Sequence, residues 1–123
     1  MKPFFTALIT SIALVNVALA TPVTNIDQAV TLVQQSVVKN KLSPLRLECI
    51  MFVEVQTESN VADYQIDVRE NHNAQCGGDP DTAPRIMTYQ VDKKTGRLCT
   101  DSPVYAERLN VDDPYNFVCR PIK

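Results

Sequence analysis

The chain contains one histidine, His72, and this is the residue whose chemistry has to be considered first. A histidine can act as the base of a Ser–His–Asp or Cys–His site, where a third group orients it. His72 lies near Glu70 and Asp79 in sequence, but no G-x-S-x-G nucleophile motif is present. We therefore predict an exposed loop histidine without a catalytic role, and a protein that is not an enzyme.

Acidic residues offer a second kind of chemistry. Two carboxylates can serve as acid and base in a glycosidase, but the sequence does not give their separation in space. The pairs Asp79-Pro80 and Asp113-Pro114 have the composition of turn starters. The segment from Gly77 to Thr82 is rich in glycine and aspartate but lacks the order of a calcium loop. We predict no metal site here.

Four cysteines, Cys49, Cys76, Cys99 and Cys119, are widely spaced. A zinc site would want closely spaced cysteine pairs or nearby histidines, and neither is present. An even number of cysteines in an exported chain favours disulfides, and four cysteines allow three pairings. The chain has only 3 glycines, with no phosphate-binding or dinucleotide motif, so we predict no cofactor.

The N-terminal segment, residues 1–20, has the pattern of a cleaved secretory signal peptide. Lys2 precedes a largely apolar run, and Ala18-Leu19-Ala20 is a signal-peptidase site. An uncleaved membrane anchor is the alternative, but the run is short and interrupted. We predict an exported, periplasmic or secreted domain over residues 21–123, with no integral membrane segment after cleavage. The net charge of −2 argues against nucleic acid as a partner.

Two periodicities predict the fold class. From Asn25, a capping residue, apolar residues recur at spacings of three and four, which predicts a helix that ends by Ser43-Pro44. Residues 45–56 then alternate with a period of two, as do 64–69, 86–92 and, more briefly, 97–100. Glu58-Ser59-Asn60 between the first two of these segments is a predicted turn. This predicts an α+β fold, one N-terminal helix packed on an antiparallel sheet of about four strands, with an irregular C-terminal tail over 101–123.

The first predicted strand has two apolar faces. Its more apolar face, with Leu45 and Val55 at its two ends, alternates with a second face that carries Ile50 and Phe52. Either the helix or a protein partner could cover the second face. A hairpin with the next strand would bring Cys76 back near Cys49, so the predicted disulfides are Cys49–Cys76 and Cys99–Cys119.

The helix, the hairpin and the segment Tyr89–Leu98 resemble PepSY-type domains, small extracytoplasmic modules of a helix followed by strands. The likeness covers residues 25–100, and its most specific part is Val91-Asp92-Lys93-Lys94-Thr95-Gly96-Arg97-Leu98. The resemblance implies regulation of peptidases in the cell envelope. This chain departs from the pattern in its four cysteines, its Gly77-Gly78 loop and its added tail. The loop also resembles segments of uncharacterised exported bacterial proteins.

The polar stretch from Glu70 to Pro84 is longer than most connections in compact domains, and such loops often bind partners. We expect a non-enzymatic, protein-binding domain of the cell envelope or exterior, inhibitor-like or regulatory toward a hydrolase. The alternative is an accessory envelope protein that docks through the sheet face around Ile50 and Phe52. The candidate partner-binding residues are Asn71, His72, Asn73, Gln75, Asp79 and Arg85.

Overall fold

The structure is a computed structural model that describes residues 3, 20–56, 58 and 61–123. The predicted signal peptide, apart from its residues 3 and 20, lies outside the described residues. The same is true of most of the turn predicted at 58–60. Among the residues described, no helix is long and apolar enough to cross a membrane.

The main helix, α1 (Ile26–Lys39), begins as its sequence predicts. The side chain of Asn25 accepts a hydrogen bond from the Gln28 amide, and the Gln28 side chain accepts one from the Thr24 amide, both at 2.9 Å. These reciprocal bonds satisfy amides that the first helical turn leaves unpaired. The helix ends at Lys39, earlier than Ser43-Pro44, because Lys41 turns to a φ of 52° and directs Leu42 into the core.

The sheet is antiparallel and five-stranded, in the order β1-β2-β3-β4-β5. Its first four strands are β1 (Ile50–Val55), β2 (Asp63–Glu70), β3 (Arg85–Asp92) and β4 (Leu98–Thr100). The chain follows this order without a crossover, because strands that are consecutive in sequence usually pair as neighbours. The fold is therefore the predicted α+β class, with one more strand than the sequence predicted.

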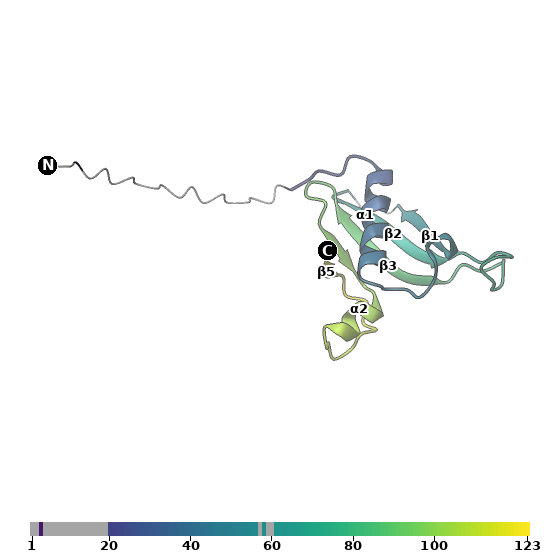
Figure 1. Ribbon diagram of the computed structural model, residues 1–123. Coiled ribbons are helices and arrows are strands. Elements are labelled where there is room, and N and C mark those ends of the chain that lie inside the picture. The colour runs from purple at the N-terminus through teal and green to yellow at the C-terminus, as the bar shows by residue number, and fades with distance from the viewer. Residues whose placement is uncertain (1–2, 4–19, 57, 59–60) are drawn as a thin grey trace.

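The core lies between α1 and one face of the sheet, which the helix crosses diagonally (Figure 1). Ile66, Val68 and Tyr89 at the centre of the sheet are fully buried against this helix. The Tyr89 hydroxyl shares a 2.9 Å hydrogen bond with the Ser36 hydroxyl of α1. Burial raises the pKa of Tyr89 to about 12, so the phenol stays protonated and its hydrogen bond holds the helix to the sheet.

The first strand differs from its prediction in length and in the face it buries. Residues Leu47–Cys49 form a short 3₁₀ helix, η1, so the strand begins at Ile50 rather than at residue 45. The helix α1 covers the face that carries Ile50 and Phe52, and Val53 on the other face is 40% exposed. Ile50 and Phe52 are thus core residues, and the docking surface proposed around them is covered by the protein itself.

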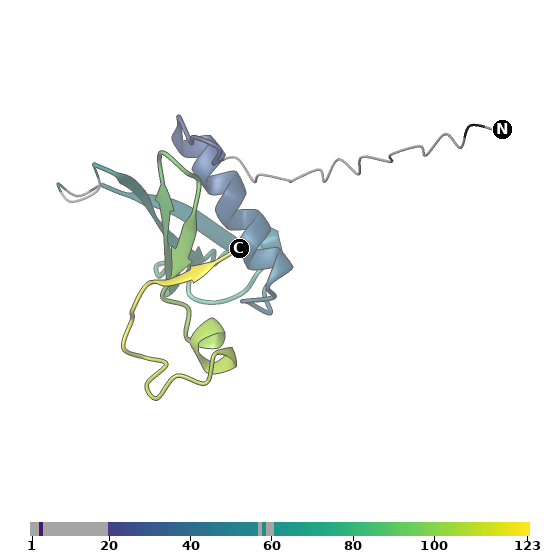
Figure 2. The same cartoon turned by 90° about the vertical axis from the view of Figure 1, so that its left-hand side faces the viewer.

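The C-terminal segment is more regular than predicted. It contains a short helix, α2 (Pro103–Arg108), at the lower side of the molecule in Figure 2, and the edge strand β5 (Arg120–Ile122), which lies above this helix and ends at the C-terminus. Three-residue strands carry too little periodicity to be recognised in a sequence. Tyr105 packs against the core. The other apolar residues of this segment are exposed rather than packed, namely Leu109, Tyr115, Phe117 and Val118.

Both predicted disulfides are present. Cys49 is bonded to Cys76 and Cys99 to Cys119, with Cα–Cα distances of 5.6 and 5.2 Å. The first connects the start of β1 to the long connection between β2 and β3. The second connects β4 to the segment that precedes β5. No cysteine is left free.

Candidate functional site

The connection between β2 and β3, residues 71–84, is called the stapled loop here. It projects beyond the end of the sheet in Figure 1. Its base is fixed to η1 by the Cys49–Cys76 disulfide and by the Asn71 amide, which donates to the Cys49 carbonyl at 2.9 Å. The Asn71 side chain also donates to the Glu48 carbonyl at 3.3 Å. The loop therefore leaves the sheet in a defined direction.

Polar side chains inside the loop hold its backbone in consecutive turns. The carboxamide oxygen of Asn73 accepts from the amides of Gln75 and Cys76, both at 2.9 Å. A carboxylate oxygen of Asp79 accepts from the Asp81 amide at the same distance. Asparagine and aspartate are common in turns because their side chains can bond backbone amides two or three residues ahead. The shape of the loop is thus set by its own residues.

The His72 ring closes the loop. Its Nε2 lies 2.6 Å from a carboxylate oxygen of Glu70, and its Nδ1 lies 2.8 Å from the carbonyl oxygen of Asp79. The ring rests on Gly78, where a Cβ would lie 2.6 Å from ring atoms. A glycine here permits both the positive φ of 81° and the close approach of the ring. The imidazole therefore joins the two arms of the loop.

The same contacts determine the charge on His72. The hydrogen bond to Glu70 is the main cause that raises the pKa of His72 above 6.5, and the bond to the Asp79 carbonyl adds to it. Both ring nitrogens face oxygen acceptors, and only the imidazolium can donate through both. The loop geometry therefore favours the protonated ring.

The arrangement Thr82–His72–Glu70 has the outline of a nucleophile, a base and an orienting acid, since the Thr82 hydroxyl lies 3.2 Å from Nδ1. In a working triad, the nitrogen facing the hydroxyl must be free to accept its proton. Here that nitrogen also faces the Asp79 carbonyl, which only accepts, so Nδ1 carries a proton. The Thr82 hydroxyl also donates to this carbonyl at 3.1 Å. The bonding suits loop closure and leaves Nδ1 without the lone pair that a base requires.

The structure brings together five of the six predicted binding residues. Asn71, His72, Asn73 and Asp79 bond within the loop or to its base, and the Gln75 amide bonds to Asn73. Asn73, Gln75 and Asp79 are exposed, and Asn71 and His72 are half-buried. All five lie in the stapled loop, and four of them, Asn71, His72, Asn73 and Asp79, also shape it through their hydrogen bonds. The exposed surface of the loop also includes Pro80 and Asp81, which the prediction omitted although both are polar-loop or turn residues by composition.

Arg85 lies apart from the stapled loop, on the sheet face opposite α1. Its guanidinium donates to Asp101 at 2.9 Å and to the Thr88 hydroxyl at 3.0 Å, and it lies 5.1 Å from the ring centre of Phe117. The Thr88 hydroxyl in turn donates to Asp67 at 2.8 Å. This network covers the sheet face opposite α1. The alternating polar residues of β2 and β3 indicate such a face in the sequence, but the partners of Arg85 come from segments distant in sequence and could not be predicted from it.

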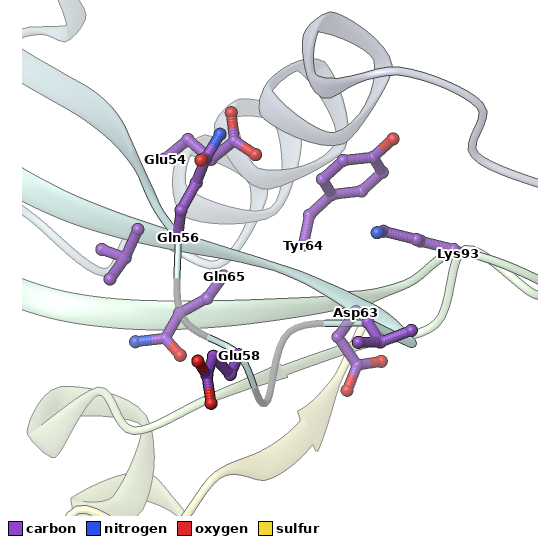
Figure 3. Close-up of a pocket in the computed structure, with 9 residues that line it drawn as sticks. Glu54, Gln56, Glu58, Asp63, Tyr64, Gln65 and Lys93 are labelled. Atoms are coloured by element: carbon purple, nitrogen blue, oxygen red, sulfur yellow. The ribbon is translucent and has the colours of Figure 1, made fainter.

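The far end of the β1–β2 hairpin, away from the stapled loop, carries a shallow hollow (Figure 3). Three carboxylates line it, those of Glu54, Glu58 and Asp63, together with Tyr64 and Lys93. The Lys93 ammonium lies 4.7 Å from the ring centre of Tyr64. Sequence reasoning missed this group, although its charges flank the predicted turn. Within the described residues, no set of side chains forms a cluster able to hold a metal ion.

Comparison with known proteins yields no significant match to a family model, a curated protein or a solved structure.

Proposed function

We propose that the protein is a small exported domain that binds another protein through the stapled loop, acting as an inhibitor or regulator of a hydrolase in the cell envelope or outside the cell. The proposal includes no catalytic activity of its own. The observation that carries it is the internal bonding of the loop, which projects from the sheet yet is closed by His72 and held by a disulfide. A loop ordered before binding loses little entropy on binding.

Two further observations support this proposal. The two disulfides, with no free cysteine, suit an oxidising compartment, as export predicts. The resemblance of the 25–100 region to PepSY-type domains supports a peptidase or related hydrolase as the partner. The accessory role rested on the sheet face around Ile50 and Phe52, and α1 covers this face. We therefore favour the loop as the contact surface.

The test is affinity capture of the tagged full chain from envelope and secreted fractions under non-reducing conditions, with mass spectrometry of the bound proteins. We expect a hydrolase to co-purify, and its activity to fall when purified protein is added. The variant Gln75→Arg places bulk and charge at an exposed loop position and should reduce both effects. The variant Gln35→Arg, a matched change on the exposed side of α1, should leave them unchanged.

Two outcomes would contradict the proposal. Capture of a structural assembly without any hydrolase would favour the accessory role. Capture of a hydrolase that is equally strong with Gln75→Arg would move the contact surface away from the stapled loop. Equal melting temperatures of both variants and the parent would show that any loss of binding comes from the surface and not from unfolding.

A further inference from the structure

The two edges of the sheet differ in how their backbone groups are satisfied. In the β3–β4 pair, the Asp101 amide donates to the Thr88 carbonyl, and the Asp92 amide donates to the Arg97 carbonyl. The backbone N–H and C=O groups of Leu98 and Thr100 therefore point toward β5. Along an edge strand, the backbone N–H and C=O groups of successive residues point alternately toward the neighbouring strand and away from the sheet. The backbone groups of Pro121 therefore point away from the sheet. Proline has no N–H, and the Pro121 carbonyl accepts the Tyr105 hydroxyl at 3.0 Å. This edge is closed to a further strand.

The other edge, β1, is open. The Asn71 amide donates to Cys49, and this register continues through Met51↔Arg69 and Val53↔Asp67, so these residues bond inward to β2. The amides and carbonyls of Phe52 and Glu54 therefore point away from the sheet. Within the described part of the chain, neither residue has a backbone hydrogen bond on that outward side.

The composition of β1 gives this edge little protection beyond the single charge of Glu54. Its six residues, IMFVEV, contain no proline or lysine, and the irregularity in register lies between β2 and β3. Natural sheets commonly protect an exposed edge with such residues, a bulge or a covering segment, because free backbone groups pair with other strands. Because the β5 edge is closed, β1 is the edge of the sheet that can pair with an added strand.

Charge indicates which kind of strand would fit. The carboxylate of Glu54 projects from β1 itself, and those of Glu58 and Asp63 lie around the same hollow (Figure 3). Across the described residues, none of these three carboxylates has an ion pair or a side-chain hydrogen bond. A cationic side chain on an added strand, directly opposite Glu54, would lie within reach of it.

We propose that the β1 edge binds an extended peptide segment of a partner protein, with a lysine or arginine opposite Glu54, which adds a strand to the sheet. The outward groups of Phe52 and Glu54 supply the backbone hydrogen bonds. Val53, 40% exposed on the opposite face, contacts an alternate side chain of the peptide. Strand addition of this kind takes its affinity from main-chain bonds and its specificity from side-chain positions. The site is separate from the exposed part of the stapled loop.

A second copy of this chain fits the same edge less well. Antiparallel pairing of two β1 strands around Phe52 would place Glu54 of each copy opposite Ile50 of the other, so the carboxylate would have no cationic partner. The chain also has a net charge of −2, which adds repulsion between copies.

The test is an NMR titration of ¹⁵N-labelled full chain with a short peptide of alternating threonine and valine that carries one central lysine. We expect the largest shifts at the Phe52 and Glu54 amides. Hydrogen exchange should slow at these two amides and change little at Met51 and Val53, which already bond to β2. A peptide with glutamate in place of the lysine should bind about fivefold more weakly, as for an exposed ion pair.

Charge reversal gives the matched control. The variant Glu54→Lys should reverse the preference between the two peptides. Asp112→Lys, the same change of charge at an exposed residue of the C-terminal segment, should leave the preference unchanged. Gln75→Arg in the stapled loop should not affect peptide binding, so failure of the loop proposal and failure of this one can be told apart.

Three results would overturn the inference. The first is absence of shifts at Phe52 and Glu54 with the lysine peptide at any accessible concentration. The second is a lysine preference that persists in Glu54→Lys. The third is slowed exchange at these two amides that grows with protein concentration in the absence of peptide, because a second copy would then occupy the edge.

Discussion

The His72 imidazole lies between two oxygen acceptors, the Glu70 carboxylate at 2.6 Å and the Asp79 carbonyl at 2.8 Å. A neutral imidazole donates through one nitrogen only, so one of these contacts would then lose its hydrogen. The Thr82 hydroxyl, 3.2 Å from Nδ1, donates its proton to the Asp79 carbonyl and so does not replace the lost hydrogen. At the scale of single residues, protonation of His72 and closure of the stapled loop are therefore coupled.

This coupling predicts a pH-dependent stability. The pKa of His72 in the folded protein is raised above its ordinary value of 6.5, with the Glu70 hydrogen bond as the largest cause. Because the folded pKa exceeds the unfolded one, the stabilisation is complete below the unfolded pKa and is lost as pH rises through the folded pKa. Thermal or urea unfolding across this window should show the decline, which His72→Gln should abolish.

Two measurements check this assignment. His72 is the only histidine, so an NMR titration of its ring reports one pKa without overlap. Glu70→Gln retains the ring but replaces its charged partner, and should lower this pKa toward 6.5. A pKa at or below 6.5 in the parent protein, or an unchanged decline of stability in His72→Gln, would contradict the coupling.

At the scale of elements, the sequence predicts those whose signals are local. The Asn25 cap and the apolar spacing of α1 depend only on neighbouring residues, and the alternation of β2 and β3 is long enough to detect. The alternation of residues 45–49 predicts a strand that is not there, because the same pattern runs through η1. Only packing determines that Ile50 and Phe52 face the helix. Tertiary contacts here override a purely periodic reading.

The stapled loop shows the same division between local and distant information. Its composition predicts a long polar loop, and the hairpin predicts that Cys76 returns to Cys49. The internal role of His72 depends on a return of the chain at Asp79, which no local pattern indicates. The β1 edge is likewise invisible in sequence, because an edge is defined only once every other strand has been placed.

The two adjacent glycines of this loop provide a matched pair for a stability prediction. Both have a positive φ, 77° at Gly77 and 81° at Gly78, so alanine at either position incurs a backbone cost of about 1–2 kcal/mol. A Cβ at Gly77 meets nothing within 4 Å, whereas one at Gly78 would lie 2.6 Å from the His72 ring. Gly78→Ala should therefore destabilise the protein more than Gly77→Ala.

Urea unfolding measures the difference between the two variants. Displacement of the ring in Gly78→Ala should also lower the His72 pKa, since the bonds to Glu70 and Asp79 would lengthen. Gly77→Ala should leave this pKa near that of the parent. Equal destabilisation together with equal pKa values would show that the ring does not rest on Gly78 in solution.

At the scale of the whole molecule, the two disulfides hold segments that the core does not. The stapled loop projects beyond the sheet, and the segment between α2 and β5 exposes Tyr115 and Phe117 by 61% and 53%. Neither segment buries enough apolar surface to order itself, so covalent bonds and local polar contacts take this role. At the end of the second segment, Ile122 is buried in the core and Pro121 bonds to Tyr105.

Removing each disulfide by paired Cys→Ala changes should therefore have similar global but different local effects. The bridged residues are 27 and 20 positions apart, so loop-closure entropy predicts a loss of about 3–4 kcal/mol in either case. Without Cys49–Cys76, hydrogen exchange should accelerate in the stapled loop, and the His72 pKa should fall. Without Cys99–Cys119, exchange should accelerate between α2 and β5 while the His72 pKa stays raised. A fall of this pKa in both variants would mean that the loop closes only when the whole fold is intact, which would contradict a loop held by its own disulfide and hydrogen bonds.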